Sequence, residues 1–211
     1  ALQGVSASLD SPSLIGLLGP NGAGKSTLMK LLVAGLLPTG GAIRADGEPL
    51  TKCERAYKAR LGYLPQDFGL FDELTVEQFL DYMGALKGLR SGRESIRAVI
   101  EAVHLGEKRR ARIRTLSGGQ RQRVGIARAL ALSPRLVVCD EPVSALDVSI
   151  QAQILNLMME LQKERNLTYL FITHNLSVVK HISDDITVMY LGQMVEKAGS
   201  AEIFAHQYHP Y

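Results

Sequence analysis

Residues 19–27 read Gly19-Pro20-Asn21-Gly22-Ala23-Gly24-Lys25-Ser26-Thr27 and match the pattern G-x-x-x-x-G-K-[ST]. The apolar run Leu14–Leu18 before them predicts a buried strand, and Lys25–Ala34 predicts a helix. In that context the glycines let the backbone wrap around phosphate oxygens, and the helix presents its first N–H groups to them. The segment therefore predicts a phosphate-binding loop (P-loop). The alternative is a glycine-rich turn that leads into a core helix.

Short apolar runs and longer helical patterns alternate along the rest of the chain, which is typical of a mostly parallel sheet covered by helices. Further strands are expected at Leu61–Leu64, Leu136–Cys139, Thr168–Thr173 and Ile186–Tyr190. Every residue of Leu136–Cys139 is apolar, as in a central strand that is buried on both faces.

Two further features complete the predicted fold. Gly40–Gly41 and Asp46–Gly47 mark turns in a small antiparallel β region near the N-terminus. Residues 72–130 are mainly helical and are expected to form a subdomain inserted in the core. We therefore predict an α/β fold with a P-loop NTPase core, and we assign residues 1–211 to a single domain.

The composition describes an ordinary globular chain, with 46% hydrophobic and 21% charged residues. The net charge of +3 gives no argument for a nucleic-acid partner, and the basic run Lys108–Arg112 is expected to be a solvated helical face. The longest apolar stretch, Leu28–Leu37, is shorter than the roughly 20 residues that span a bilayer. No signal segment is expected. Cys53 and Cys139 lie far apart, which indicates neither a disulfide framework nor a zinc site.

Four side chains, two in the P-loop and two carboxylates later in the sequence, are expected to act on a bound nucleoside triphosphate. Lys25 is expected to reach the β- and γ-phosphates, and the Ser26 hydroxyl to bind Mg²⁺. Asp140 and Glu141 follow the strand Leu136–Cys139, so they lie at the carboxyl edge of the sheet, where an open α/β fold binds its ligand. Asp140 is then a Mg²⁺ carboxylate acting through water, and Glu141 a general base for the attacking water. Alone, such a pair is more often solvated surface.

The sequence Leu116-Ser117-Gly118-Gly119-Gln120 precedes a predicted helix that runs to about Leu130. A serine hydroxyl, two glycine amides and a helix N-terminus make an anion site, although Ser117 taken alone is better explained as a helix cap. In its spacing before Asp140, LSGGQ resembles the signature of the ATPase subunits of ABC transporters. The resemblance implies that Ser117, Gly118, Gly119 and Gln120 bind the γ-phosphate of ATP held by a partner subunit. It also implies ATP and Mg²⁺ as the ligands.

Three further positions fit this resemblance. Gln66, after the strand Leu61–Leu64, resembles the Q-loop glutamine, which in the family contacts Mg²⁺ and the water and relays to the membrane partner. Asp147, in Ser144-Ala145-Leu146-Asp147, resembles the D-loop of the dimer interface, and His174 the switch histidine that contacts the γ-phosphate. The plain alternatives are a loop glutamine, a helix cap and a strand-end histidine. The order of the motifs favours catalytic roles for Gln66 and His174 beside Glu141.

The resemblance covers nearly the whole chain but changes character along it. Residues 15–32 and 62–88 look like exporter-type ATPases, whereas the sequence from about Leu132 looks like the ATPases of dipeptide and oligopeptide importers. A recombined or engineered join and an unusual natural branch are the two explanations. The aromatic residue that stacks on adenine in the family is expected upstream of this sequence, with Tyr63 and Phe68 as alternatives. A regulatory tail is expected beyond its end.

These motifs predict an ATP-hydrolysing subunit of an ABC transporter, with peptides as the expected cargo. The expected partners are a second ATPase subunit in a head-to-tail dimer and transmembrane permease subunits, with no nucleic acid. The chain is then expected at the cytoplasmic face of the cell membrane, as a peripheral protein. Two alternatives stay open: a soluble ABC-type ATPase that acts on nucleic acid or ribosomes, and a chimeric chain that binds nucleotide without powering transport.

Overall fold

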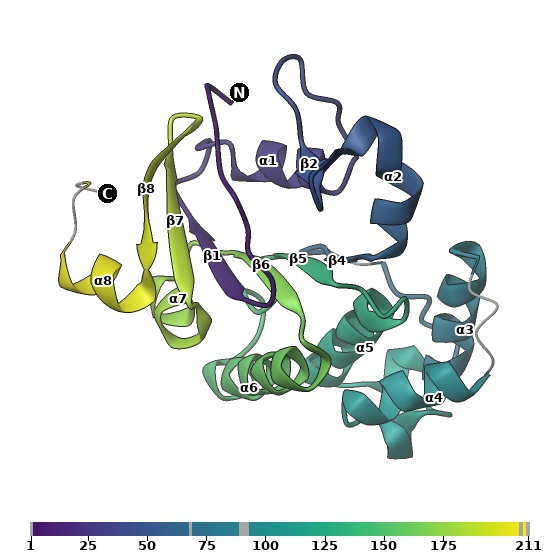
Figure 1. The fold of residues 1–211 in the computed structure, drawn as a ribbon. Coiled ribbons are helices and arrows are strands. Elements are labelled where there is room, and N and C mark those ends of the chain that lie inside the picture. Colours follow the sequence, from purple (N-terminus) through teal and green to yellow (C-terminus); the bar gives the residue numbers. More distant parts are fainter. Residues whose placement is uncertain (1, 68, 89–92, 207–208, 210–211) are drawn as a thin grey trace.

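A six-stranded sheet runs through the centre of the molecule in the order β4-β5-β6-β1-β7-β8 (Figure 1). This computed structural model describes residues 2–67, 69–88, 93–206 and 209. The strands are β1 (Leu14–Leu18), β4 (Leu61–Leu64), β5 (Leu136–Asp140), β6 (Thr168–Ile172), β7 (Asp185–Tyr190) and β8 (Gln193–Gly199). All neighbours pair in parallel except β7 and β8, which are antiparallel. The predicted fold class is therefore confirmed.

The small antiparallel sheet also forms where the turn residues indicated it. Strands β2 (Arg44–Ala45) and β3 (Glu48–Pro49) pair around Asp46 and Gly47, whose φ angles are +50° and +84°. Two consecutive residues with positive φ make the type of turn that matches the twist of a two-residue hairpin. The local Asp46-Gly47 sequence thus determines the tight turn between β2 and β3.

Helices cover both faces of the central sheet, with α1 and α2 on one side and α5, α6 and α7 on the other (Figure 1). The helices are α1 (Lys25–Leu32), α2 (Leu50–Ala59), α3 (Val76–Leu86), α4 (Arg93–Ala102), α5 (Gly118–Leu130), α6 (Val148–Arg165), α7 (Leu176–Ile182) and α8 (Ser200–Ala205), with short 3-10 turns η1 (Gly106–Lys108) and η2 (Ile113–Thr115). Helices α3, α4 and α5 and the two 3-10 turns lie within residues 72–130, where a mainly helical region was expected.

The side chains of the inner strands explain this two-sided cover. Successive residues of a strand point to opposite faces of the sheet. Val137 and Cys139 accordingly join the large core beneath α5 and α6, whereas Val138 joins the core beneath α1. All three are almost completely buried. The uninterrupted apolar run of β5 is what a strand covered on both faces requires.

Gly16 permits one helix to approach the sheet closely. A Cβ atom at Gly16 would lie 2.5 Å from Val179 Cγ1 and 2.7 Å from Ser183 Oγ, both on or next to α7. Residue 16 therefore has to lack a side chain for α7 to pack where it does. Within the described ranges, no helix combines the length and the apolar character that a bilayer span requires.

The prediction that Lys108–Arg112 forms a helical face was wrong. Helical geometry ends with η1 at Lys108, and the backbone then pairs with Thr75 and with the first residues of α3. The run is nevertheless largely solvated, as expected: Lys108, Arg110 and Arg112 are exposed, while Arg109 pairs with Glu77 and Arg112 with Glu73. Backbone pairing to another segment outweighed the local helical preference.

Candidate active site

The carboxyl ends of four neighbouring parallel strands bring most of the predicted site residues to one edge of the sheet. In register, Ile172 of β6 lies beside both Leu17 of β1 and Asp140 of β5. The P-loop leaves the end of β1, Glu141 follows β5, and His174 comes two residues after β6. Gln66 follows β4, the strand beside β5. Parallel order, which puts all carboxyl ends together, is thus the reason that these distant residues meet.

Glycines shape the loop between β1 and α1. A Cβ at Gly19 would overlap the carbonyl oxygen of Met189 on β7, so the loop passes too close to the sheet for any side chain there. Gly22 and Gly24 have φ angles of +83° and +100°, which glycine adopts at little cost. No side chain caps the N-terminus of α1, where Gly24 stands in the cap position. The first N–H groups of α1 therefore face an anion site made of backbone.

Lys25 lies inside this loop with only 8% of its surface exposed. Its Nζ atom donates hydrogen bonds to the carbonyl oxygens of Gly19 at 2.6 Å and Pro20 at 3.0 Å. Burial lowers the pKa of the Lys25 ammonium, while the nearby carboxylates of Glu141 and Asp140 act in the opposite direction. The ammonium group is thus held between the loop that follows β1 and the carboxylates at the end of β5, two strands away in the sheet.

Asp140 and Glu141 place two carboxylates next to that lysine. Burial is the main cause that raises the pKa of Asp140, the neighbouring Glu141 raises it further, and Lys25 opposes both. A partly desolvated carboxylate of this kind favours a cation as its neighbour. No group of three or more acidic, histidine or cysteine side chains suited to a metal occurs in the part of the chain that the structure describes. The oxygen donors of Ser26, Asp140 and Gln66 suit Mg²⁺, which keeps several waters and binds through one or two carboxylates together with phosphates.

Glu141 and His174 are joined directly. His174 Nδ1 lies 2.8 Å from Glu141 Oε1. The backbone of Glu141 has a φ of +46°, an uncommon conformation for a residue with a side chain. Its N–H donates to the carbonyl of Ile172 at 2.8 Å, and its own carbonyl accepts from Ser144 N at 3.2 Å and Ser144 Oγ at 3.0 Å. The surrounding backbone therefore maintains a strained turn that directs Glu141 toward the histidine.

Ser117 caps α5. Its Oγ accepts from Gln120 N at 3.3 Å, and Gln120 Oε1 in turn accepts from Ser117 N at 3.0 Å. The helix-cap alternative for Ser117 is therefore confirmed. Capping uses only a lone pair of the hydroxyl oxygen and leaves the hydroxyl hydrogen free to donate. A Cβ at Gly119 would lie 2.6 Å from Ile150 Cγ2, which shows how closely the LSGGQ segment packs on α6. In the described residues no hydrogen bond or ion pair joins this segment to the P-loop.

The other predicted residues lie as follows. Gln66 is exposed beyond the end of β4. Asp147 stands in the N-cap position of α6, but its exposed side chain makes no capping hydrogen bond. Tyr63 is half-buried on β4, where burial raises its pKa, and it packs against the core beneath α1. Phe68 lies outside the described residues.

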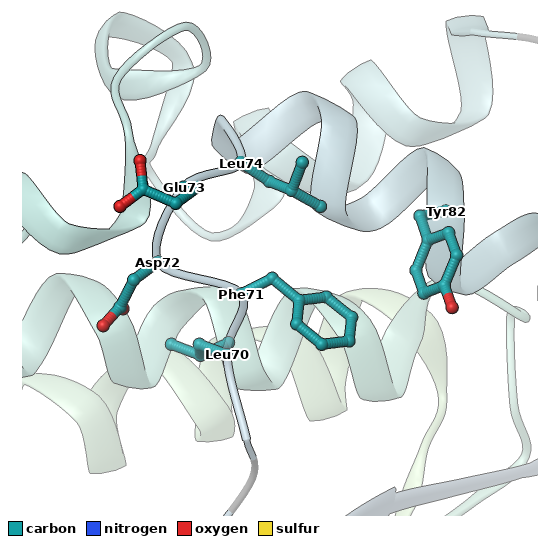
Figure 2. Close-up of a pocket in the computed structure, with 6 residues that line it drawn as sticks. All are labelled: Leu70, Phe71, Asp72, Glu73, Leu74 and Tyr82. Carbon is teal, nitrogen blue, oxygen red and sulfur yellow. The ribbon is translucent and has the colours of Figure 1, made fainter.

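One surface feature was not predicted from the sequence. An open pocket of about 500 Å³ lies before and along α3 (Figure 2), lined by Leu70, Phe71, Asp72, Glu73, Leu74 and Tyr82, which we call the α3 groove. Phe71 and Tyr82 are 49% and 45% exposed, and their rings meet edge to face at 5.6 Å. The signal available in the sequence was the apolar pair Leu70–Phe71 in a predicted loop. Apolar side chains that gather on a surface often mark a site where a partner binds.

A buried lysine in a glycine-rich loop, with carboxylates from the end of a nearby parallel strand, defines a nucleotide-binding protein of the P-loop class. The family described as "ABC transporter" matches residues 2–144, and the chain belongs to this family. Its fold is that of known ABC subunits. The CbiO1 part of the CbiONQ ABC transporter complex of Clostridium perfringens superposes with a TM-score of 0.90 at 28% identity, covering 98% of this chain and 85% of that one.

Relatives align along the whole chain. The oligopeptide transport ATP-binding protein AppF of Bacillus subtilis is 42% identical over 100% of this chain and 68% of its own length. The dipeptide transport ATP-binding protein DppF of Escherichia coli is also 42% identical, over 100% of this chain and 66% of its own length. The N-terminal half, which looks like exporter-type ATPases, is thus matched by the same proteins as the rest.

These findings confirm the predicted family and activity. The chain is an ATP-binding subunit of an ABC transporter and an ATPase that powers transport. Subunits of this family bind ATP, dimerise and work with transmembrane permeases. The alternative of a soluble ATPase acting on nucleic acid is not favoured.

Proposed function

We propose that the chain powers the import of peptides through a permease, as a peripheral protein at the cytoplasmic face of the membrane. The observation that supports this cargo most directly is the 42% identity, over the entire chain, to ATPases named for oligopeptide and dipeptide transport. We treat residues 1–211 as one ATPase domain, with residues 72–130 as its helical subdomain.

The P-loop, residues Gly19 to Thr27, holds the triphosphate. Phosphate oxygens replace the carbonyls of Gly19 and Pro20 as partners of the Lys25 ammonium, because a phosphate is the stronger acceptor. Ser26, Asp140 and Gln66 hold Mg²⁺, Asp140 through water. When bound, the Mg²⁺ neutralises negative charge on the β- and γ-phosphates.

Glu141 acts as the general base. It takes a proton from a water molecule whose oxygen attacks the γ-phosphorus, and the bond between that phosphorus and the bridging oxygen breaks. ADP leaves with the bridging oxygen, and inorganic phosphate forms. His174 keeps the carboxylate of Glu141 in one orientation through Nδ1, and its second ring nitrogen contacts the γ-phosphate.

The signature segment acts on the partner's nucleotide. The free hydrogen of the Ser117 hydroxyl and the amides of Gly118 and Gly119 donate to the γ-phosphate of ATP bound by the second subunit, and Gln120 holds the turn. Two chains arranged head to tail then form two composite sites, with Asp147 at the interface between them. Supporting this arrangement, LSGGQ forms a complete helix cap that needs no contact to its own P-loop.

The α3 groove is the permease contact. It begins four residues after Gln66, and its exposed Phe71 and Tyr82 offer an apolar edge to a cytoplasmic segment of the permease. Gln66 and the first residues of the groove lie on the same loop between β4 and α3. A permease segment bound in the groove would therefore be connected to the nucleotide site through this loop.

Peptide uptake tests the proposal. In the source organism, replacing Glu141 by Gln in the chromosomal gene should abolish uptake of labelled di- or oligopeptides and leave uptake of free amino acids unchanged. The exposed Glu164→Gln change on α6 serves as the matched control and should have no effect. Unchanged peptide uptake in the Glu141→Gln strain would contradict the assigned cargo.

A further inference from the structure

We propose that Arg121 is a positioning residue for the LSGGQ segment. By pairing with Asp72, it makes the position of LSGGQ depend on whether a partner occupies the α3 groove. The inference rests on the proposed function, since it concerns how the groove acts on the composite site. Arg121 directly follows LSGGQ in the first turn of α5, and Asp72 lines the groove. The Arg121 Nη2 atom lies 2.8 Å from Asp72 Oδ1.

A backbone ladder joins the groove to the segment that leads into LSGGQ. Ile113 N donates to Leu74 O at 3.0 Å, and Arg114 N donates to Asp72 O at 3.2 Å. On the α3 side, Val76 and Glu77 donate to the carbonyls of residues 111 and 109 at 3.2 and 3.1 Å. Residues 72–77 and 109–115 are therefore a single connected unit. A shift of the groove wall at Asp72 moves Arg114, which is three residues before Ser117.

The side chain of Arg121 closes this unit from the other end. Its Nη1 donates to the carbonyl of Ile113 at 3.4 Å, while its backbone N–H donates to Ser117 O at 2.8 Å. One residue thus contacts the groove, the connecting turn η2 and the serine of the signature.

Packing makes the groove wall responsive to what fills it. Phe71, beside Asp72, meets Phe79 and Tyr82 of α3 edge to face at centroid distances of 6.0 and 5.6 Å. Figure 2 shows the Phe71 and Tyr82 rings at the groove. Phe79 is completely buried, whereas Phe71 and Tyr82 are half-exposed. A partner that displaces the Phe71 ring therefore displaces the backbone that carries Asp72.

The Arg121–Asp72 pair is partly exposed, with 36% and 53% of the two side chains accessible. Exposed ion pairs contribute little to stability, so breaking this pair should not unfold the protein. Its effect should instead appear where the position of Ser117 matters, in the association of two ATP-loaded subunits. A merely structural role would change the melting temperature and leave that association intact.

The test measures ATP-dependent dimerisation by sedimentation velocity in the Glu141→Gln background, which holds ATP without turnover. Arg121→Gln and Asp72→Asn should each weaken the dimer about 5- to 10-fold, with unchanged melting temperature and unchanged binding of ATP to the monomer. The exchanged pair Asp72→Arg with Arg121→Asp should recover affinity to within about 2-fold of the parent. The control Arg97→Gln breaks a similar ion pair, to Glu77 at 3.3 Å, without touching α5, and should leave the dimer unchanged.

A mutant cycle tests the link to the groove. Phe71→Ala should weaken the dimer in the parent but add nothing to Arg121→Gln, whereas it should act independently of Arg97→Gln. The inference is overturned if Arg121→Gln dimerises like the parent, or if Arg97→Gln weakens the dimer equally. It is also overturned if the exchanged pair does not recover dimer affinity, or if the effects of Phe71→Ala and Arg121→Gln on dimer affinity are additive. If the Glu141→Gln parent itself fails to dimerise with ATP, the composite site of the proposed function falls, and the inference with it.

Discussion

The imidazole of His174 and the carboxylate of Glu141 form a direct contact, with Nδ1 and Oε1 2.8 Å apart. The two residues come from the ends of adjacent strands, β5 and β6, which pair through Asp140 and Ile172. The contact therefore depends on the register of the central sheet and on the left-handed turn at Glu141. It commits one ring nitrogen of His174 to the carboxylate and leaves the other for the substrate.

Glu141→Gln should reduce ATP turnover at least about 100-fold, since a positioned general base is worth 10²–10⁴-fold. Binding of ATP should persist, because the amide has the same shape and the cradle around Lys25 is unaltered. Steady-state phosphate release and equilibrium binding of ATP measure the two effects. Turnover above about a tenth of the wild-type rate would contradict the role of Glu141 as base.

His174→Ala should lower turnover by removing the orientation of Glu141 and a contact to the γ-phosphate. Added to Glu141→Gln, it should cause little further loss, because residues that act as a unit are strongly non-additive. Comparison of kcat for the two single variants and the double variant measures this. Independent, multiplying losses would mean that the 2.8 Å contact has no part in the reaction.

Chains with Lys25→Ala and chains with Ser117→Arg should each be inactive alone, since each variant disables both composite sites of its own dimer. An equal mixture contains mixed dimers with one complete site, so activity should reappear at up to about a quarter of the wild-type level. Phosphate release by the mixture and by each variant at equal concentration gives the answer. Full activity of the Ser117→Arg chain alone would rule out the composite site.

The strands and their chemistry were predictable because their signals are local. The all-apolar run before Asp140 marks a doubly covered strand, and the glycines before Lys25 mark a loop that must approach other backbone closely. The family resemblance added Ser117 and His174, whose residue types alone also fit a helix cap and a strand-end histidine. In the structure Ser117 does cap α5, so the capping pattern alone does not reveal a function.

The α3 groove and the ladder behind it were not predictable in this way. Their contacts join residues about forty positions apart, such as Asp72 with Arg114, and no periodicity in either segment records the pairing. The same pairing explains why Lys108–Arg112 is not a helical face. The arginines of this run and the acidic residues 73 and 77 lie far apart in the sequence, and only the fold shows that Arg109 pairs with Glu77 and Arg112 with Glu73.

Gly16→Ala should destabilise the protein by about 1–3 kcal/mol, as overpacking does, because the new Cβ meets Val179 and Ser183 of the α7 region. Gly40→Ala is the matched control, since nothing lies within 4 Å of its Cβ position. Urea unfolding should show a lower midpoint for Gly16→Ala alone. Equal midpoints for the two variants would mean that α7 moves away from β1 without cost.

The place of β1 in the sheet governs when the protein can acquire its nucleotide site during synthesis. Both partners of the strand that carries the P-loop come from far downstream in the sequence: Ile15 pairs with Leu170 on one side and with Asp185 on the other. A nascent chain therefore emerges from the ribosome with its loop sequence complete but without the two strands that hold it, until β6 and β7 have been translated. Such distant pairing slows folding and leaves apolar strands exposed meanwhile. Messages truncated before β6 should yield chains that need chaperones and hold no ATP.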